Sequence, residues 1–288
     1  MKSHLVKLMM LLVIPVFGVT YLQAQGQRNT DYYGDQASKP HAMPQINNSP
    51  KDGPVAGCNV LIAPADDDGS FGSPLQAYLL SYGDLGSVDL YDARYSIPSL
   101  AQLQAYDVVI TWCNYSYYGG GVAMGDVLAD YVDGGGKVIN MVWTFGVGGN
   151  LLHGRFIDEN YTAMQGGSWS AGYSCLGAFD PGHPIMSGVT NACDSWRILS
   201  TTLTAGSSVV SYWADGLILV AVKDDYSVVS INSYPGYNSS YTGQIPDVVH
   251  NSVLWLCQGT QVPVSNWALA IGVLLILGFT VIRFAKNS

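Results

Sequence analysis

Four short, strand-like runs separated by longer connections are the feature that most limits the fold of this chain. The runs comprise residues 59–63, 88–91, 107–112 and 137–143. Two connections, residues 73–82 and 122–132, have the apolar spacing of helices. Continuous apolar strands joined by helices of this length form parallel sheets that are buried on both faces. The sequence therefore predicts an α/β fold with a mainly parallel sheet flanked by helices.

The later half of the chain has a different pattern. Three closely spaced apolar runs occupy residues 209–213, 217–222 and 227–231, and Asp-containing turns connect them. Short connections of this kind join antiparallel strands. We expect an antiparallel extension of the sheet, closed by a helix over residues 246–257. The globular α/β domain is predicted to span residues 58–258.

The N-terminal residues have the features of a secretory signal peptide. Lys2 and Lys7 precede an apolar stretch that runs from Leu8 to Val19. Ala24 provides a small residue at which a signal peptidase could cleave. We predict a signal peptide over residues 1–24, with an uncleaved N-terminal anchor as the alternative. Residues 25–57 are rich in Gln, Asn, Pro, Ser and Asp and lack an apolar period, which predicts a flexible linker.

Near the C-terminus, residues 268–284 form an apolar run long enough to span the hydrocarbon core of a membrane. Trp267 lies at the expected interface, and Arg283 and Lys286 satisfy the positive-inside rule. The sequence thus predicts one C-terminal transmembrane helix, a cytoplasmic tail over residues 285–288 and a domain outside the cytoplasm. A buried helix is the alternative interpretation.

The segment before this run, residues 259–267, contains Pro263, Ser265 and Trp267. The order of a Pro-containing motif, an apolar helix and a basic end resembles the C-terminal sorting signals of the PEP-CTERM and IPTL-CTERM groups of bacterial surface proteins. The resemblance implies a processing enzyme as a partner and a cell-surface location after cleavage. Permanent anchoring in the membrane is the alternative.

The charge distribution limits the partners of the exported part. Four of the 12 Lys and Arg residues lie in the terminal segments, whereas all 21 acidic residues lie between them. Eight positive against 21 negative residues give that part a net charge of −13. Such a surface repels nucleic acid, whose recognition requires basic patches.

Five cysteines lie between the terminal segments, where disulfides can persist after export. We predict a disulfide between Cys175 and Cys193, which would close a short loop rich in Gly and Pro. Cys58 and Cys257 form a second predicted pair. The fifth cysteine, Cys113, follows a predicted strand, and we interpret it as a small buried residue or, alternatively, as a reactive thiol. The spacing shows no zinc motif.

Six segments carry a resemblance to a known fold. They are residues 60–69, 106–110, 128–139, 183–189, 215–221 and 251–255. In this order they resemble the class I glutamine amidotransferase-like, flavodoxin-like fold, in the divergent secreted form found in bacterial surface proteins. The resemblance covers most of residues 59–257.

Active members of that family use a Cys on the turn after the strand equivalent to residues 137–143, activated by a His-x-Glu pair. Here the turn after Trp143 contains no Cys, and Glu159, the single Glu, does not follow a His by two residues. A thiol nucleophile needs an adjacent base. We therefore expect no amidotransferase activity, and the sequence favours a protein that is not an enzyme.

Asp66, Asp67 and Asp68 form the most suggestive polar cluster. Three adjacent carboxylates repel one another unless a cation or a helix N-terminus neutralises them. Oxygen ligands of this kind favour Ca²⁺ or Mg²⁺. The alternative is a solvated turn that caps the next helix, and we predict no other cofactor.

Aromatic residues in Gly- and Ser-rich loops provide the competing candidate site. Tyr115, Tyr117, Tyr118 and Trp169 are the main candidates, with Tyr173, Tyr234, Tyr237 and Tyr241 in similar loops. Such rings stack on sugars or contact partner proteins, or they pack the loops onto the sheet. We expect a non-catalytic surface module that binds a glycan or a protein. The alternative is a divergent hydrolase or metal-dependent enzyme that uses Asp66–Asp68.

Overall fold

The computed structural model describes residues 57–67, 72–147, 151–170, 172–236 and 239–258. The predicted signal peptide, almost all of the linker, the sorting motif, the transmembrane helix and the tail lie outside these residues. Within the described ranges, none of the helices has the length and apolar character needed to cross a membrane.

The domain is built on a ten-stranded sheet whose first half is parallel. Its five parallel strands lie in the order β2 (Ser87–Leu90), β1 (Asn59–Ile62), β3 (Val108–Thr111), β4 (Lys137–Met141) and β13 (Val228–Ile231). Four of them correspond to the four strand-like runs in the first half of the sequence. The predicted parallel sheet is therefore confirmed for this half of the domain.

The second half of the sheet is antiparallel and larger than predicted. From β13 outward it contains β12 (Ile218–Lys223), β11 (Ser207–Trp213), β7 (Ser174–Phe179), β8 (Ala192–Asp194) and β14 (Thr242–Gly243). The sequence predicts β11, β12 and β13 but not β7, β8 or β14. The result is a mixed sheet, in which the predicted antiparallel extension is larger than expected.

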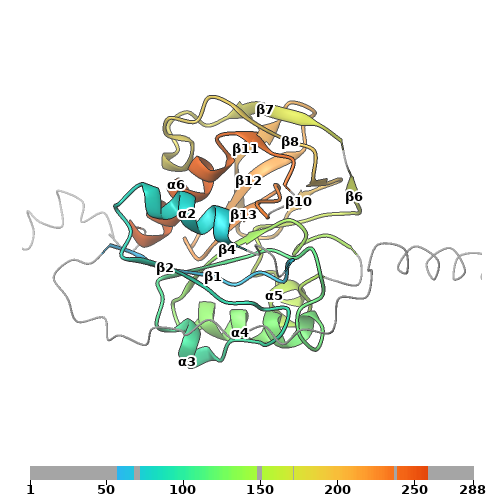
Figure 1. The fold of residues 1–288 in the computed structure, drawn as a ribbon. Coiled ribbons are helices and arrows are strands. Elements are labelled where there is room, and N and C mark those ends of the chain that lie inside the picture. Colours follow the sequence, from blue (N-terminus) through green and yellow to red (C-terminus); the bar gives the residue numbers. More distant parts are fainter. Residues whose placement is uncertain (1–56, 68–71, 148–150, 171, 237–238, 259–288) are drawn as a thin grey trace, which may run out of the picture. The chain divides into compact units, whose positions relative to one another are not determined.

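Helices cover both faces of the parallel half. Figure 1 shows α2 (Ser73–Ser81) and α6 (Ile245–Gln258) above the strands, and α3 (Leu100–Leu103), α4 (Gly121–Asp133) and α5 (Arg155–Asp158) below them. Successive side chains of a strand face opposite sides of a sheet. Accordingly, Val60 and Ile62 pack in the cluster that contains α2 and α6, whereas Leu61 packs with α3, α4 and α5.

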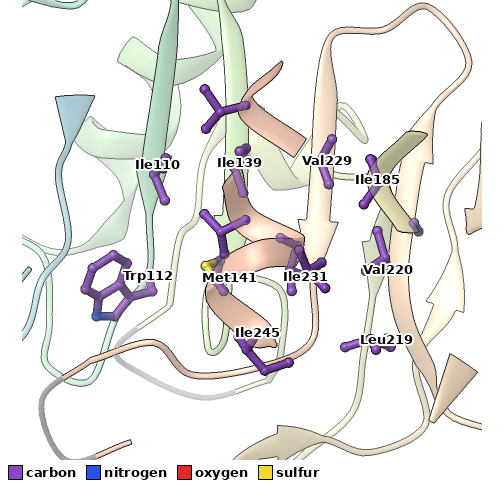
Figure 2. Packing of buried hydrophobic residues seen from close by; sticks show 14 of the residues in the cluster. Ile110, Trp112, Ile139, Met141, Ile185, Leu219, Val220, Val229, Ile231 and Ile245 are labelled. Carbon is purple, nitrogen blue, oxygen red and sulfur yellow. The ribbon is translucent and has the colours of Figure 1, made fainter. Parts of the chain in front are cut away.

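Helix α6 fills the centre of the upper layer. Pro246 lies in its first turn, where a missing N–H costs nothing. Figure 2 shows Ile245 at the start of α6 close to the strand residues Met141 and Ile231, and these three side chains are fully buried. The short 3₁₀ helix η1 (Pro184–Met186) contributes Ile185 to the same core. The helix predicted over residues 246–257 is confirmed.

Two small strand pairs complete the described structure. They are β5 (Met164–Gln165) with β10 (Thr202–Leu203), and β6 (Trp169–Ser170) with β9 (Arg197–Ile198). Neither pair was predicted, because two-residue strands have no periodicity to read.

Both predicted disulfides are present. Cys175 and Cys193 face each other on the antiparallel strands β7 and β8, and Cys58 joins the start of β1 to Cys257 at the end of α6. Cys113 is free and buried. Two disulfides in one domain are typical of an oxidising, extracytoplasmic compartment.

Candidate functional site

The loops that follow the parallel strands form the candidate site. Beyond the ends of β1 and β3, the chain continues in register, with Ala65 N donating to Trp112 O at 3.0 Å. Asn114 N and Tyr115 N then both donate to Ala65 O, at 2.9 and 3.0 Å. Ligands of open α/β sheets bind outside these carboxyl ends. The backbone bonds hold the two loops together at that edge.

Asp66 lies at the centre of this edge and its side chain is fully buried. The carboxylate accepts hydrogen bonds from Trp112 Nε1 at 2.6 Å and from the Tyr234 hydroxyl at 2.8 Å. The backbone N–H of Asp67 donates to it at 2.8 Å. One carboxylate thus connects the loops after β1, β3 and β13. Burial raises the pKa of Asp66, and these hydrogen bonds oppose the rise.

The alternative of a solvated turn is wrong for Asp66, because its side chain is buried. Its side chain points inward because Trp112 and Tyr234 supply donors there. Asp67 is half-buried, and Asp68 lies outside the described residues. In the described part of the chain, no group of three or more His, Cys, Asp or Glu residues is placed to hold a metal ion.

Tyr117 is also buried, contrary to its predicted place on the surface. Its hydroxyl lies 2.7 Å from Thr111 Oγ1 and donates to Trp112 O at 3.1 Å. Burial raises the pKa of Tyr117 well above its usual value. Tyr234 is buried on the other side of the edge. For these two rings the alternative interpretation is correct, because they fasten the loops to the sheet.

Tyr118 and Tyr115 remain at the surface beside an arginine that the sequence did not single out. We call Arg94, Tyr115 and Tyr118 the aromatic rim. The Tyr118 side chain is 59% exposed, and Arg94 Cζ lies 3.9 Å from the centroid of the half-buried Tyr115 ring. Tyr118 N donates to Ala93 O at 2.9 Å, which joins the loops after β2 and β3. A basic residue three positions after the predicted strand over residues 88–91 was the available signal for Arg94.

A second group of rings lies beyond Tyr234. The Trp143 ring is 5.1 Å from that of Tyr234 and 5.8 Å from that of Trp196. Both tryptophans are half-buried, so they pack the loops after β4 and before β9 against each other. These ring contacts hold the loop after β4 against the loops after β13 and before β9.

The other predicted aromatic residues are not brought to the rim by any described contact. The backbone of Trp169 belongs to β6, whereas its side chain is not among the described parts of the structure. Tyr173 is exposed, Tyr241 is half-buried, and Tyr237 lies outside the described residues.

Cys113 does not have the surroundings of a nucleophile. Its thiol is buried, and burial raises its pKa. Among the described residues, no histidine is hydrogen-bonded to it. His250 instead pairs with Asp84 at 2.9 Å and stacks on Tyr82, and His183 accepts a hydrogen bond from Ile185 N. A thiol in this state is not activated for attack.

A pocket of about 240 Å³ lies at the opposite, amino end of the parallel strands. Its lining includes Gln104, Asp107, Tyr131 and Lys137 together with the turn of Gly134 to Gly136. None of the predicted binding residues contributes to it.

No family model matches the chain, and no curated protein matches it. Several solved structures are similar to it at low identity. A cytoplasmic protein from Salmonella typhimurium is 14% identical, with a TM-score of 0.47 over 68% of this chain and 98% of its own.

Two further structures carry names related to the fold expected from the sequence. A putative GMP synthase protein from Thermoplasma acidophilum is 9% identical, with a TM-score of 0.45 over 69% of this chain and 95% of its own. A putative ThuA-like protein from Parabacteroides merdae is 12% identical, with a TM-score of 0.47 over 71% and 92%. At TM-scores below 0.5, these similarities establish neither a family nor a function for this chain.

Proposed function

We propose that this chain is an exported, membrane-anchored, non-catalytic module that binds a glycan through the aromatic rim. The observation that carries the proposal is the exposed Tyr118 ring beside the Arg94–Tyr115 stack, at the carboxyl edge of the sheet. Aromatic rings with an apolar face and a polar hydroxyl suit the faces and hydroxyls of sugars.

The rim is held in place before any ligand binds. The buried Tyr117 hydroxyl and the backbone N–H groups of Tyr115 and Tyr118 fasten the loop at three points. A ring presented by an ordered loop loses little conformational freedom on binding. The arrangement therefore supports binding by an existing surface.

A glycan suits the rim better than a protein partner. Stable protein interfaces bury roughly 800 Å² on each partner. Among the described residues, the large exposed apolar side chains in the loops after β3 and β4 and at the start of α4 are Tyr118, Val147 and Val122. The others lie elsewhere, such as Leu80 on α2 and Tyr212 on β11. A small aromatic platform with one cation matches a sugar residue in size.

The alternative function is a hydrolase or metal-dependent enzyme that uses Asp66. Its raised pKa favours this alternative, because catalytic acids have shifted pKa values. However, a Cβ placed on Gly236 would collide with Asp66 Oδ2, so the loop after β13 lies directly on the carboxylate. Substrate access would require this loop to move away.

The location is proposed on two grounds. The disulfides support export, and the apolar run over residues 268–284 supports a membrane anchor. Processing near Pro263 would convert the anchored protein into a surface-attached one.

The test is a glycan-binding assay on the full-length chain in detergent micelles. We expect Tyr118→Ala to weaken binding about fivefold to tenfold, since a stacked ring contributes about 1 kcal/mol. Tyr212→Ala is the matched control, because Tyr212 is also exposed but lies on β11, and it should leave binding unchanged. EDTA should have no effect. Binding that survives Tyr118→Ala, or the absence of any glycan ligand, would contradict the proposal.

A further inference from the structure

Arg94 differs from most cations of the described residues, and Lys137 at the start of β4 is the other one whose side chain forms no hydrogen bond or ion pair there. Arg155 pairs with Asp130, Asp133 and Glu159, and Arg197 pairs with Asp215. Lys223 donates to Ala205 O at 2.7 Å. Within the described ranges, the Arg94 side chain has no hydrogen-bond or ion-pair partner, and its contacts are the rings of Tyr115 and Tyr95.

The half-buried Arg94 side chain contacts aromatic rings rather than hydrogen-bond acceptors. Its Cζ lies 3.9 Å from the Tyr115 ring centroid and 5.4 Å from that of Tyr95. A guanidinium that rests on a ring uses its flat face, whereas its five N–H donors lie in the plane of the group. The rings thus hold the arginine without satisfying its hydrogen-bonding capacity.

The carboxylates of Asp92 and Asp66 accept hydrogen bonds from groups other than the Arg94 guanidinium. Asp92 is buried, and one of its oxygens accepts from the backbone N–H of Arg94 at 3.1 Å. Asp66 is occupied by Trp112 and Tyr234. No carboxylate oxygen of the described residues forms an ion pair with the Arg94 guanidinium.

We infer that the aromatic rim recognises acidic glycans, with Arg94 binding the carboxylate of a uronic or sialic acid residue while Tyr118 contacts the sugar ring. This inference rests on the proposed function. A planar guanidinium binds a carboxylate through two parallel hydrogen bonds, which a neutral sugar cannot provide. The acidic surroundings repel all anions at long range, an acidic glycan included, but this repulsion is screened beyond about 8 Å at physiological salt, so the pairing with Arg94 must outweigh it only at contact.

The experiment compares matched acidic and neutral probes on the full-length chain in detergent micelles. The first pair is an oligogalacturonate and its methyl ester, and the second is sialyllactose and lactose. We expect the acidic member of at least one pair to bind about tenfold more tightly than its neutral counterpart. Arg94→Gln should abolish the difference, and Arg94→Lys should restore it only in part, because an ammonium cannot form the paired bonds.

The thermal unfolding midpoint of each variant, measured without ligand, provides the control for folding. Equal binding of acidic and neutral probes, or a preference that persists in Arg94→Gln, would overturn the inference while leaving the proposed function intact. Failure of all four probes to bind would overturn both. If Arg94→Gln lost its native unfolding transition, Arg94→Lys would replace it in the comparison of probe pairs. An Arg94→Lys protein that preferred the acidic probes as strongly as the wild type does would then count against the inference.

Discussion

Asp66 joins three loops through a single buried carboxylate. Asp66→Ala would leave the Trp112 indole N–H and the Tyr234 hydroxyl without their acceptor. Each unsatisfied buried donor costs about 1–3 kcal/mol. We therefore expect a loss of roughly 2–4 kcal/mol in the free energy of unfolding. Denaturant titration measures this loss, with the exposed Asp158→Ala as the matched control. If Asp66→Ala lowered the free energy of unfolding no more than the control does, the hydrogen bonds of Asp66 to the three loops would not be important for stability.

The same carboxylate makes stability depend on pH in a defined direction. Its folded-state pKa is raised above the ordinary value of 3.8, so the native state takes up the proton more readily than the unfolded state. Its favourable contribution is present below pH 3.8 and is lost as the pH rises through the folded-state pKa. We expect the free energy of unfolding of the wild type, relative to Asp66→Asn, to fall as the pH rises from 3.8 through the folded-state pKa. A relative stability that rises over this range would contradict the assignment.

Single residues show where prediction from sequence stops. Asp66, Tyr115 and Tyr118 were correctly expected near the ends of strands, because a turn follows each apolar run. The burial of Asp66 depends on Trp112 and Tyr234, which are 46 and 168 residues away along the chain. Local pattern contains no information on such contacts. Arg94 was missed for the same reason, since its role depends on stacking against Tyr115.

Among the secondary-structure elements, the predictable ones are those with their own apolar period. The four parallel strands of the first half and the helices α2, α4 and α6 lie close to the predicted ranges. Strands β8 and β14 were not predicted because they are short, and the six-residue β7 was missed because its sequence, SCLGAF, has no continuous apolar run. All three pair with distant neighbours, and the Cys175–Cys193 bond joins β7 to β8. The antiparallel half was therefore underestimated.

The two disulfides connect elements at very different separations, and this difference leads to a prediction. Cys58 and Cys257 are 199 residues apart, whereas Cys175 and Cys193 are 18 apart. A cross-link stabilises mainly by restricting the unfolded chain, and more so for longer loops. Replacing both Cys58 and Cys257 by Ser should lower the free energy of unfolding by about 2 kcal/mol more than replacing Cys175 and Cys193. Denaturant titration of the two double variants provides the comparison, and the reverse order would contradict it.

For the molecule as a whole, the fold places a hydrogen-bonded interior beneath the proposed binding edge. Buried hydrogen bonds from Asp66, Tyr117 and Tyr234 fix the loops, and the aromatic rim lies on the outer side of the same loops. The parallel half of the sheet was predictable, and with it the edge on which a site would lie. The proposal of an acidic glycan depends on the contact between Arg94 and Tyr115, which a local sequence pattern cannot predict.

Protection of Tyr118 from chemical nitration tests the central claim most directly, because it reports the place of binding as well as its occurrence. The full-length chain would be treated with tetranitromethane, with and without a saturating acidic oligosaccharide, and the modified residues identified by mass spectrometry. The internal control is Tyr226, which is 46% exposed in the turn before β13, at the amino end of that strand. We predict that the bound glycan slows nitration of Tyr118 severalfold and leaves Tyr226 unchanged. Equal nitration of Tyr118 with and without bound glycan would show that the rim is not the binding site.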